Sequence, residues 1–238
     1  MSKVSKVRSS RLGTQLRGEM SAAYDSRGKT SADLILHYSP KAKCNVALSG
    51  QLQFLHFLYC EIDSNVETAN YSPRTLIAAL AGESFATLVD AEIKTVDGNV
   101  VWHRLVETEP DKTEFLDDLR NAVGKGPLTG IAAVETWTAD RLTANPMRLR
   151  NSLRAVAWMS AARHWPLAEF KSKALVLIRK RRSVTFDEVL GLEDGPYRAL
   201  SGAAVLELAC TGVVRSDLFE APLRGLTQFH ALGEPHEK

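Results

Sequence analysis

The first clear pattern of apolar positions along the chain is helical. Four apolar residues recur at the spacing of one helix face: Leu52, Leu55, Tyr59 and Ile62. They follow Ser49, a residue type that commonly caps helix N-termini, and the pattern stops at a polar run after Ile62. The sequence therefore predicts a helix that ends at about this point.

Runs of β-forming residues follow this helix. Turn-forming residues separate them, which is the pattern of neighbouring antiparallel strands. The predicted strands are Arg74–Leu80, Phe85–Thr95 and Asn99–Thr108.

The dipeptide Asp97-Gly98 between the last two runs is the strongest local turn signal. Asp-Gly flanked by β-forming residues favours a two-residue hairpin turn. Counting back from such a turn along both strands sets Asp90 opposite Leu105. This register is the geometric basis of the candidate site described next.

Three carboxylates are expected to converge on one face of the hairpin. Because side chains alternate between the faces of a sheet, Glu107 and Glu109 share the face of Asp90, and His103 falls on the same face. Neighbouring carboxylates repel one another unless a cation or solvent intervenes, and Mg²⁺ prefers oxygen ligands of this kind. The alternative is a solvated outer face of an antiparallel sheet, where acidic residues are common.

Beyond the hairpin the pattern becomes mainly helical. It ends in two short β-compatible runs on either side of Gly225, and three helices with such a ribbon are typical of a winged helix. The last helix is largely apolar, which predicts packing rather than an exposed recognition helix. The predicted elements are a helix over Lys112–Val123, a strand over Leu128–Val134, helices over Pro146–His164, Leu167–Arg182, Phe186–Leu190 and Pro196–Thr211, and the ribbon over Val213–Leu232.

Composition fits an ordinary globular protein. The chain has 238 residues, of which 45% are hydrophobic and 24% charged, and no apolar run approaches the ~20 residues that cross a bilayer. The N-terminus lacks the apolar core of a signal peptide, so a cytoplasmic location is expected. Three cysteines without metal-ligand spacing predict reduced, mostly buried thiols.

The net charge of +2 conceals strong segregation along the chain. The first 30 residues carry seven basic residues against two acidic ones, whereas residues 83–120 carry ten acidic residues against four basic ones. Positive flanks around an acidic centre suggest polyanion binding around a cation site. The candidate DNA-binding residues form one basic run: Lys171, Lys173, Arg179, Lys180, Arg181 and Arg182. A solvated helix end is the alternative for this run.

Several short motifs, in this order and spacing, resemble those of TnsA-type endonucleases, the subunits of heteromeric transposons that cleave 5′ ends. The resemblance spans about residues 45–160. The segments that carry it are Ser49–Leu55, Ile62–Val66, Tyr71–Pro73, Val106–Pro110, Val134–Trp137, Asn145 and Asn151–Leu153.

The resemblance implies a restriction-endonuclease-like core of the PD-(D/E)XK superfamily, with a central mixed sheet flanked by helices. A winged-helix-like C-terminal domain would follow. The implied divisions are a basic flexible arm over residues 1–40, the nuclease-like domain over residues 41–164 and the winged-helix-like domain over residues 165–238.

The resemblance also assigns roles to four residues. Asp90 and Glu107 would ligate Mg²⁺ or Mn²⁺, Glu109 would act as base or second ligand, and Gln53 would position a metal-bound water or the scissile phosphate. Two of these positions depart from the family pattern. Gln53 replaces an acidic residue and Glu109 replaces the lysine of E-x-K. A minority of restriction endonucleases carry E-x-E, so both an active and an inactive site stay open.

The resemblance implies DNA as a partner, together with a DDE-type transposase and an ATPase regulator, in association with the bacterial nucleoid. The first hypothesis is a metal-dependent DNA endonuclease subunit for transposition. The second is a catalytically inactive DNA-binding adaptor on the same fold, which would need no metal. The third is a winged-helix transcription regulator. The sequence has no Walker-type loop, G-x-G-x-x-G, G-x-S-x-G or H-E-x-x-H, which argues against nucleotide hydrolysis, dinucleotide redox, serine hydrolase and zinc hydrolase chemistry.

Overall fold

A computed structural model of the chain describes residues 33–108 and 114–232. Glu109 and residues 1–32 of the predicted arm lie outside the described residues. The last part of that arm is not irregular, because β1 (Leu34–Ser39) pairs antiparallel with β2 (Cys44–Ser49). Ile35 and Val46 pack against the main core cluster, which accounts for the ordered hairpin.

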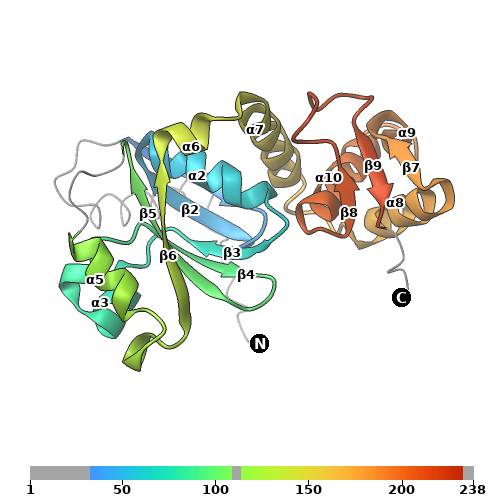
Figure 1. The fold of residues 1–238 in the computed structure, drawn as a ribbon. Helices are drawn as coiled ribbons and strands as arrows, with labels where there is room; N and C mark the ends of the chain where they lie inside the picture. Colours follow the sequence, from blue (N-terminus) through green and yellow to red (C-terminus); the bar gives the residue numbers. More distant parts are fainter. Residues whose placement is uncertain (1–32, 109–113, 233–238) are drawn as a thin grey trace, which may run out of the picture.

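The first part of the chain is an α/β unit around a four-stranded mixed sheet (Figure 1). Its elements after β2 are α2 (Gly50–Ile62), β3 (Val66–Asn70), α3 (Arg74–Ala81), α4 (Glu83–Ala86), β4 (Ala91–Thr95), β5 (Val100–Val106), α5 (Glu114–Ala122), the 3-10 helix η1 (Gly126–Leu128), β6 (Ile131–Thr138), α6 (Ala139–Thr143) and α7 (Pro146–Ala161). The strand order is β3-β4-β5-β6, with β5 and β6 parallel and the other neighbours antiparallel. This arrangement confirms the predicted central mixed sheet flanked by helices.

Successive residues of β5 pack against helices on opposite faces of this sheet. Trp102 is fully buried in a cluster with residues of α3 and α5, whereas Leu105 clusters with residues of α2 and α6. The predicted helix after Ser49 is confirmed as α2, with Ser49 at its N-cap position. These layers place α2 against one face of the sheet, where it contacts β3 and β5.

The segment Arg74–Leu80 is a helix and not the predicted strand. It forms most of α3, which follows Pro73, and the N–H of Ile77 donates to the Pro73 carbonyl at 3.0 Å. Ile77, Leu80 and Ala81 recur at helical spacing and pack in the cluster around Trp102. The predicted strand Phe85–Thr95 is likewise shortened, since α4 occupies its beginning and only Ala91–Thr95 forms β4.

The β4–β5 hairpin is confirmed, but its register differs from the prediction by one residue. The N–H of Thr95 donates to the carbonyl of Asn99, so the loop has three residues, and Gly98 takes a φ of 85°. A three-residue loop with glycine in its last position is the next most common hairpin connection after the two-residue turn. Ala91 therefore pairs with His103, and Asp90 does not lie opposite Leu105.

The second part of the chain contains three helices and a three-stranded antiparallel sheet. Its elements are α8 (Ala168–Arg181), β7 (Ser183–Thr185), α9 (Phe186–Leu190), α10 (Tyr197–Cys210), β8 (Val214–Ser216) and β9 (Gln228–Ala231). The sheet order is β7-β9-β8. As predicted, α10 packs into the protein, and its residues Ala203–Leu206 are fully buried.

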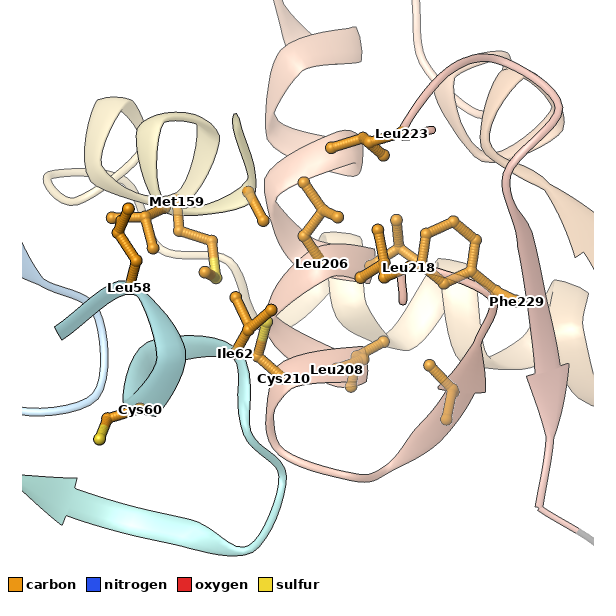
Figure 2. Close-up of a cluster of buried hydrophobic side chains, with 14 of the residues drawn as sticks. Leu58, Cys60, Ile62, Met159, Leu206, Leu208, Cys210, Leu218, Leu223 and Phe229 are labelled. Carbon is orange, nitrogen blue, oxygen red and sulfur yellow. The ribbon is translucent and has the colours of Figure 1, made fainter. Parts of the chain in front are cut away.

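One hydrophobic cluster runs through both parts of the chain. Figure 2 shows Ile62 of α2 and Met159 of α7 facing Leu206 and Cys210 of α10, with Phe229 of β9 further along the same cluster. The α2 and α7 helices therefore form a shared boundary layer between the two sheets. No described helix has the length and apolar character that crossing a membrane requires.

A buried asparagine reinforces this boundary. The Asn151 amide on α7 donates to the carbonyls of Leu218 and Ala221, both at 2.7 Å, and its carbonyl accepts the N–H of Leu223 at 2.9 Å. Because all three partners belong to the segment between β8 and β9, α7 is fixed to the second part by hydrogen bonds as well as by apolar packing.

Candidate functional site

Asp90 lies immediately before β4, and its carboxylate is held by two groups of β5. One oxygen, Oδ2, accepts the N–H of Leu105 at 2.7 Å and a bond from the Arg104 guanidinium at 3.3 Å. The pairing of β4 with β5 ends at Ala91 and His103, so the Leu105 N–H has no backbone partner on β4. The Asp90 carboxylate accepts this N–H in its place. Burial raises the pKa of Asp90, and the Leu105 N–H and Arg104 partly oppose that shift.

Gln53 lies beside Asp90, as the resemblance implies, but its amide contacts backbone groups. Its Nε2 donates to the carbonyls of Tyr71 at 3.0 Å and Asp90 at 3.2 Å, and its Oε1 accepts the N–H of Ser49 at 2.6 Å. Gln53 therefore ties the first turn of α2 to the residues before β4. In this arrangement its amide is a structural link rather than a free ligand.

Glu107 lies in the bend after the end of β5 and is exposed. The one-residue change in register removes the argument that placed it on the face of Asp90. Glu109 lies outside the described residues, so its predicted role stays a prediction. Within the described ranges, no three side chains of the His, Cys, Asp or Glu type gather as a metal site.

The described residues therefore do not by themselves fit the expected Mg²⁺ site. One oxygen of Asp90 already accepts two hydrogen bonds, and the Gln53 amide is occupied by backbone partners. No catalytic step through a metal follows from this arrangement. The roles of Asp90 and Glu107 as metal ligands stay predictions.

A buried pair of histidines, one on α2 and one on β5, was not identified from the sequence. His56 Nε2 and His103 Nδ1 are 2.8 Å apart, and Cys60 Sγ lies 3.6 Å from His56 Nε2. Burial and, to a smaller extent, the nearby Arg141 cation together lower the pKa of His103 to about 3. Burial also places the pKa of His56 well below its usual value, so both rings are neutral at pH 7. The sequence signal that could have indicated this pair is His56, which lies one helical turn from Cys60 among apolar residues of α2.

The histidine pair is connected to the surface at β6. His103 Nε2 lies 4.0 Å from a carboxylate oxygen of Glu135, and Arg141 lies 3.4 Å from the same oxygen. The Arg141 guanidinium also stacks over the Trp137 ring at 3.6 Å. A chain of polar groups thus joins the core under α2 to a half-exposed ion pair at the sheet surface.

The six residues of the predicted basic run divide into two groups. Three are paired within the protein: Lys171 with Glu207 at 2.6 Å, Lys173 with Glu169 and Glu193 at 2.8 and 2.6 Å, and Arg181 with Glu188 at 2.5 Å. The side chains of the other three have no acidic partner among the described residues and are exposed: Arg179, Lys180 and Arg182. They end α8 and begin the turn into β7, so the available positive charge lies at this end of the helix.

Comparisons with protein-family models, curated proteins and solved structures find no match to this chain.

Proposed function

We propose that this chain is a TnsA-like, DNA-binding subunit of a DNA transposition system that acts as an adaptor beside the transposase. The resemblance in sequence motifs suggests the family. The order α2, β3, β4, β5, α5 and the parallel strand β6, with α3 and α4 inserted between β3 and β4, is compatible with a restriction-endonuclease-like core. Three helices with a β7-β9-β8 sheet are likewise compatible with a winged helix.

The observation that carries the adaptor role is the state of Asp90. Its carboxylate is used by Arg104 and the Leu105 N–H, and its neighbour Gln53 binds backbone carbonyls. These contacts stabilise the junction of α2, β4 and β5. A side chain that serves such a junction is better suited to preserving the fold than to exchanging ligands during a reaction.

The available positive charge supports DNA as the partner. Arg179, Lys180 and Arg182 project from one end of α8 without acidic partners in the described part of the chain. Lysine and arginine contacts to phosphates supply most of the sequence-independent affinity for DNA. Because α10 is largely buried, we assign the DNA contact to this end of α8 rather than to α10.

A metal-dependent endonuclease is the second candidate, and one observation favours it. Gln53 and Asp90 are adjacent in the structure, as the family pattern implies for the helix residue and the strand aspartate. Glu107 follows β5 closely enough in sequence to approach this point if Glu109 and a metal ion complete the site. This candidate requires Asp90 to exchange at least one of its present partners.

The two candidates differ in whether DNA cleavage depends on Asp90. The purified chain, Asp90→Ala and Glu107→Ala are incubated with supercoiled plasmid and Mg²⁺ or Mn²⁺, alone and with the transposase. Gel shifts at low salt are measured on the same samples. The adaptor proposal predicts a DNA shift by all three proteins and no nicking that depends on either carboxylate. Nicking that both substitutions abolish would establish the endonuclease instead. Absence of any shift would overturn both candidates.

A further inference from the structure

Two adjoining hollows lie on the surface where α7, α10 and the β1–β2 turn meet. The larger, of about 540 Å³, lies between the end of α7 and the start of α10. The smaller, of about 240 Å³, lies beside the β1–β2 turn and the start of α8. Ala162 and Trp165 line both hollows, so the two share a wall.

The larger hollow is apolar and has aromatic walls. Trp165 is 55% exposed and Tyr197 50% exposed, which is unusual for side chains of this size. Their rings lie edge to face, with centroids 6.5 Å apart. Small side chains between the aromatic walls leave the space open: Ala157, Ala161 and Ala199.

A third aromatic wall is held rigidly in place. The Trp158 ring lies against Gly202 of α10, where an added Cβ would come within 2.3 Å of the ring atom Cζ3. The same ring also packs edge to face with Phe186, with centroids 5.3 Å apart. The glycine therefore lets α10 approach Trp158 closely, and the hollow is formed before any ligand arrives.

The smaller hollow carries an excess of positive charge. Its charged lining residues are Lys43, Arg163, Lys171 and Glu207. Lys171 and Glu207 form an ion pair at 2.6 Å and compensate each other. Lys43 and Arg163 are exposed and have no acidic partner among the described residues. The net charge next to the apolar hollow is therefore positive.

We propose that the two hollows together bind a small amphipathic anion. Its apolar body would lie between Trp158, Trp165 and Tyr197, and its anionic group would reach Lys43 and Arg163 beyond the shared wall. The larger hollow, of about 540 Å³, falls in the range of ~300–1,000 Å³ that is typical of small-molecule sites, and the smaller hollow adds about 240 Å³ beside it. A stable protein partner would instead need roughly 800 Å² of surface on each side, far more than these few side chains offer. This inference does not depend on the proposed role in transposition.

The test uses a matched pair of fluorescent probes. The first is 8-anilinonaphthalene-1-sulfonate, whose sulfonate stays negative at all working pH values. The second is N-phenyl-1-naphthylamine, which has the same rings and no anionic group. We expect the full chain to bind the sulfonate at one saturable site, with quenching of tryptophan emission. Sodium decanoate should displace the probe, whereas decanol should displace it less well.

Variants separate the apolar part of the site from the cationic part. Lys43→Gln combined with Arg163→Gln should weaken binding of the sulfonate by about tenfold and leave binding of the neutral probe within about twofold. Ala161→Trp, at an exposed position inside the larger hollow, should weaken binding of both probes. The control is Arg179→Gln combined with Lys180→Gln, which removes the same charge elsewhere and should change neither affinity.

Several results would overturn the proposal. One is binding of the sulfonate that is insensitive to Ala161→Trp, because the probe would then lie elsewhere. Another is an equal effect of the double glutamine substitution on both probes, which would show that Lys43 and Arg163 do not bind the anionic group. Absence of saturable binding of either probe or of decanoate would leave no small-molecule site. A probe stoichiometry well above one would indicate general hydrophobic adsorption.

Discussion

The carboxylate of Asp90 and the guanidinium of Arg104 lie 3.3 Å apart where β4 begins to pair with β5. Their side chains are 33% and 30% exposed, so solvent screens part of the attraction. Arg104 also donates to the Thr87 carbonyl at 3.0 Å, which links the residues before β4 to β5 a second time. Arg104 therefore forms an ion pair with Asp90 and also holds the segment before β4 against β5.

Substitutions of Asp90 and Arg104 should each destabilise the fold, and their effects on the free energy of unfolding should not be additive. Partly exposed ion pairs contribute roughly 0.5–1 kcal/mol, and we expect a coupling of about that size between Asp90→Ala and Arg104→Ala. Urea denaturation of the wild type, both single variants and the double variant measures it. Strict additivity of the two single effects would show that the pair does not stabilise the fold.

DNA affinity should depend on the unpaired residues of the basic run and not on the paired ones. Arg179→Ala and Lys180→Ala should each weaken binding and lower the slope of log K against log salt by about 0.9 for each phosphate that is no longer neutralised. Lys173→Ala is the matched control, because Lys173 already binds Glu169 and Glu193. Equal effects of all three variants would show that ion pairing within the protein does not select the DNA contacts.

The buried His103 should make the protein sensitive to acid. The pKa of His103 is about 3 in the folded protein and about 6.5 in an unfolded chain, so the unfolded chain binds more protons between these values. Stability contributed by the neutral ring is complete above about pH 6.5 and falls as the pH decreases, by about 1.4 kcal/mol per pH unit.

Replacement of this histidine isolates its contribution. His103→Asn keeps a polar partner for His56 but removes the titration, so its free energy of unfolding should vary less steeply between pH 6.5 and pH 4.5. Urea denaturation at several pH values in this interval measures both slopes. Parallel curves for the two proteins would mean that His103 does not carry the pH dependence.

Alanine substitutions at the neighbouring residues Ser201 and Gly202 of α10 should have opposite effects on stability. Gly202→Ala should destabilise by roughly 1–3 kcal/mol, because the new methyl group overlaps the Trp158 ring. Ser201→Ala should be neutral or slightly stabilising, since the Ser201 hydroxyl is buried and finds no hydrogen-bond partner in the described structure. Chemical denaturation of both variants compares them, and a neutral Gly202→Ala would contradict the close packing.

The main helices could be predicted from the sequence, but the register of the β4–β5 hairpin could not, because it depends on whether the loop has two or three residues. The pattern from Leu52 to Ile62 and the predicted helix Phe186–Leu190 correspond to α2 and α9. The Asp97-Gly98 signal identified the hairpin, but two-residue and three-residue loops share that dipeptide. Because side chains alternate faces, this difference was enough to change the predicted environment of Asp90.

The remaining differences arise from tertiary packing. The β-compatible residues of Arg74–Leu80 form a helix since Ile77 is buried in the cluster around Trp102. The His56–His103 contact joins residues 47 positions apart and could not be read from local spacing. Likewise, which members of the basic run are neutralised depends on Glu193 and Glu207, which are distant in sequence.

The three hydrogen bonds of Asn151 and the apolar cluster of Figure 2 join the four-stranded and the three-stranded sheets through direct contacts of α7 and α2. A duplex gripped at the far end of α8 would consequently be presented to the four-stranded sheet at one fixed angle. If the chain binds DNA as proposed, a partner enzyme that docks on it would meet the duplex in that same orientation, whether or not the chain itself cuts DNA.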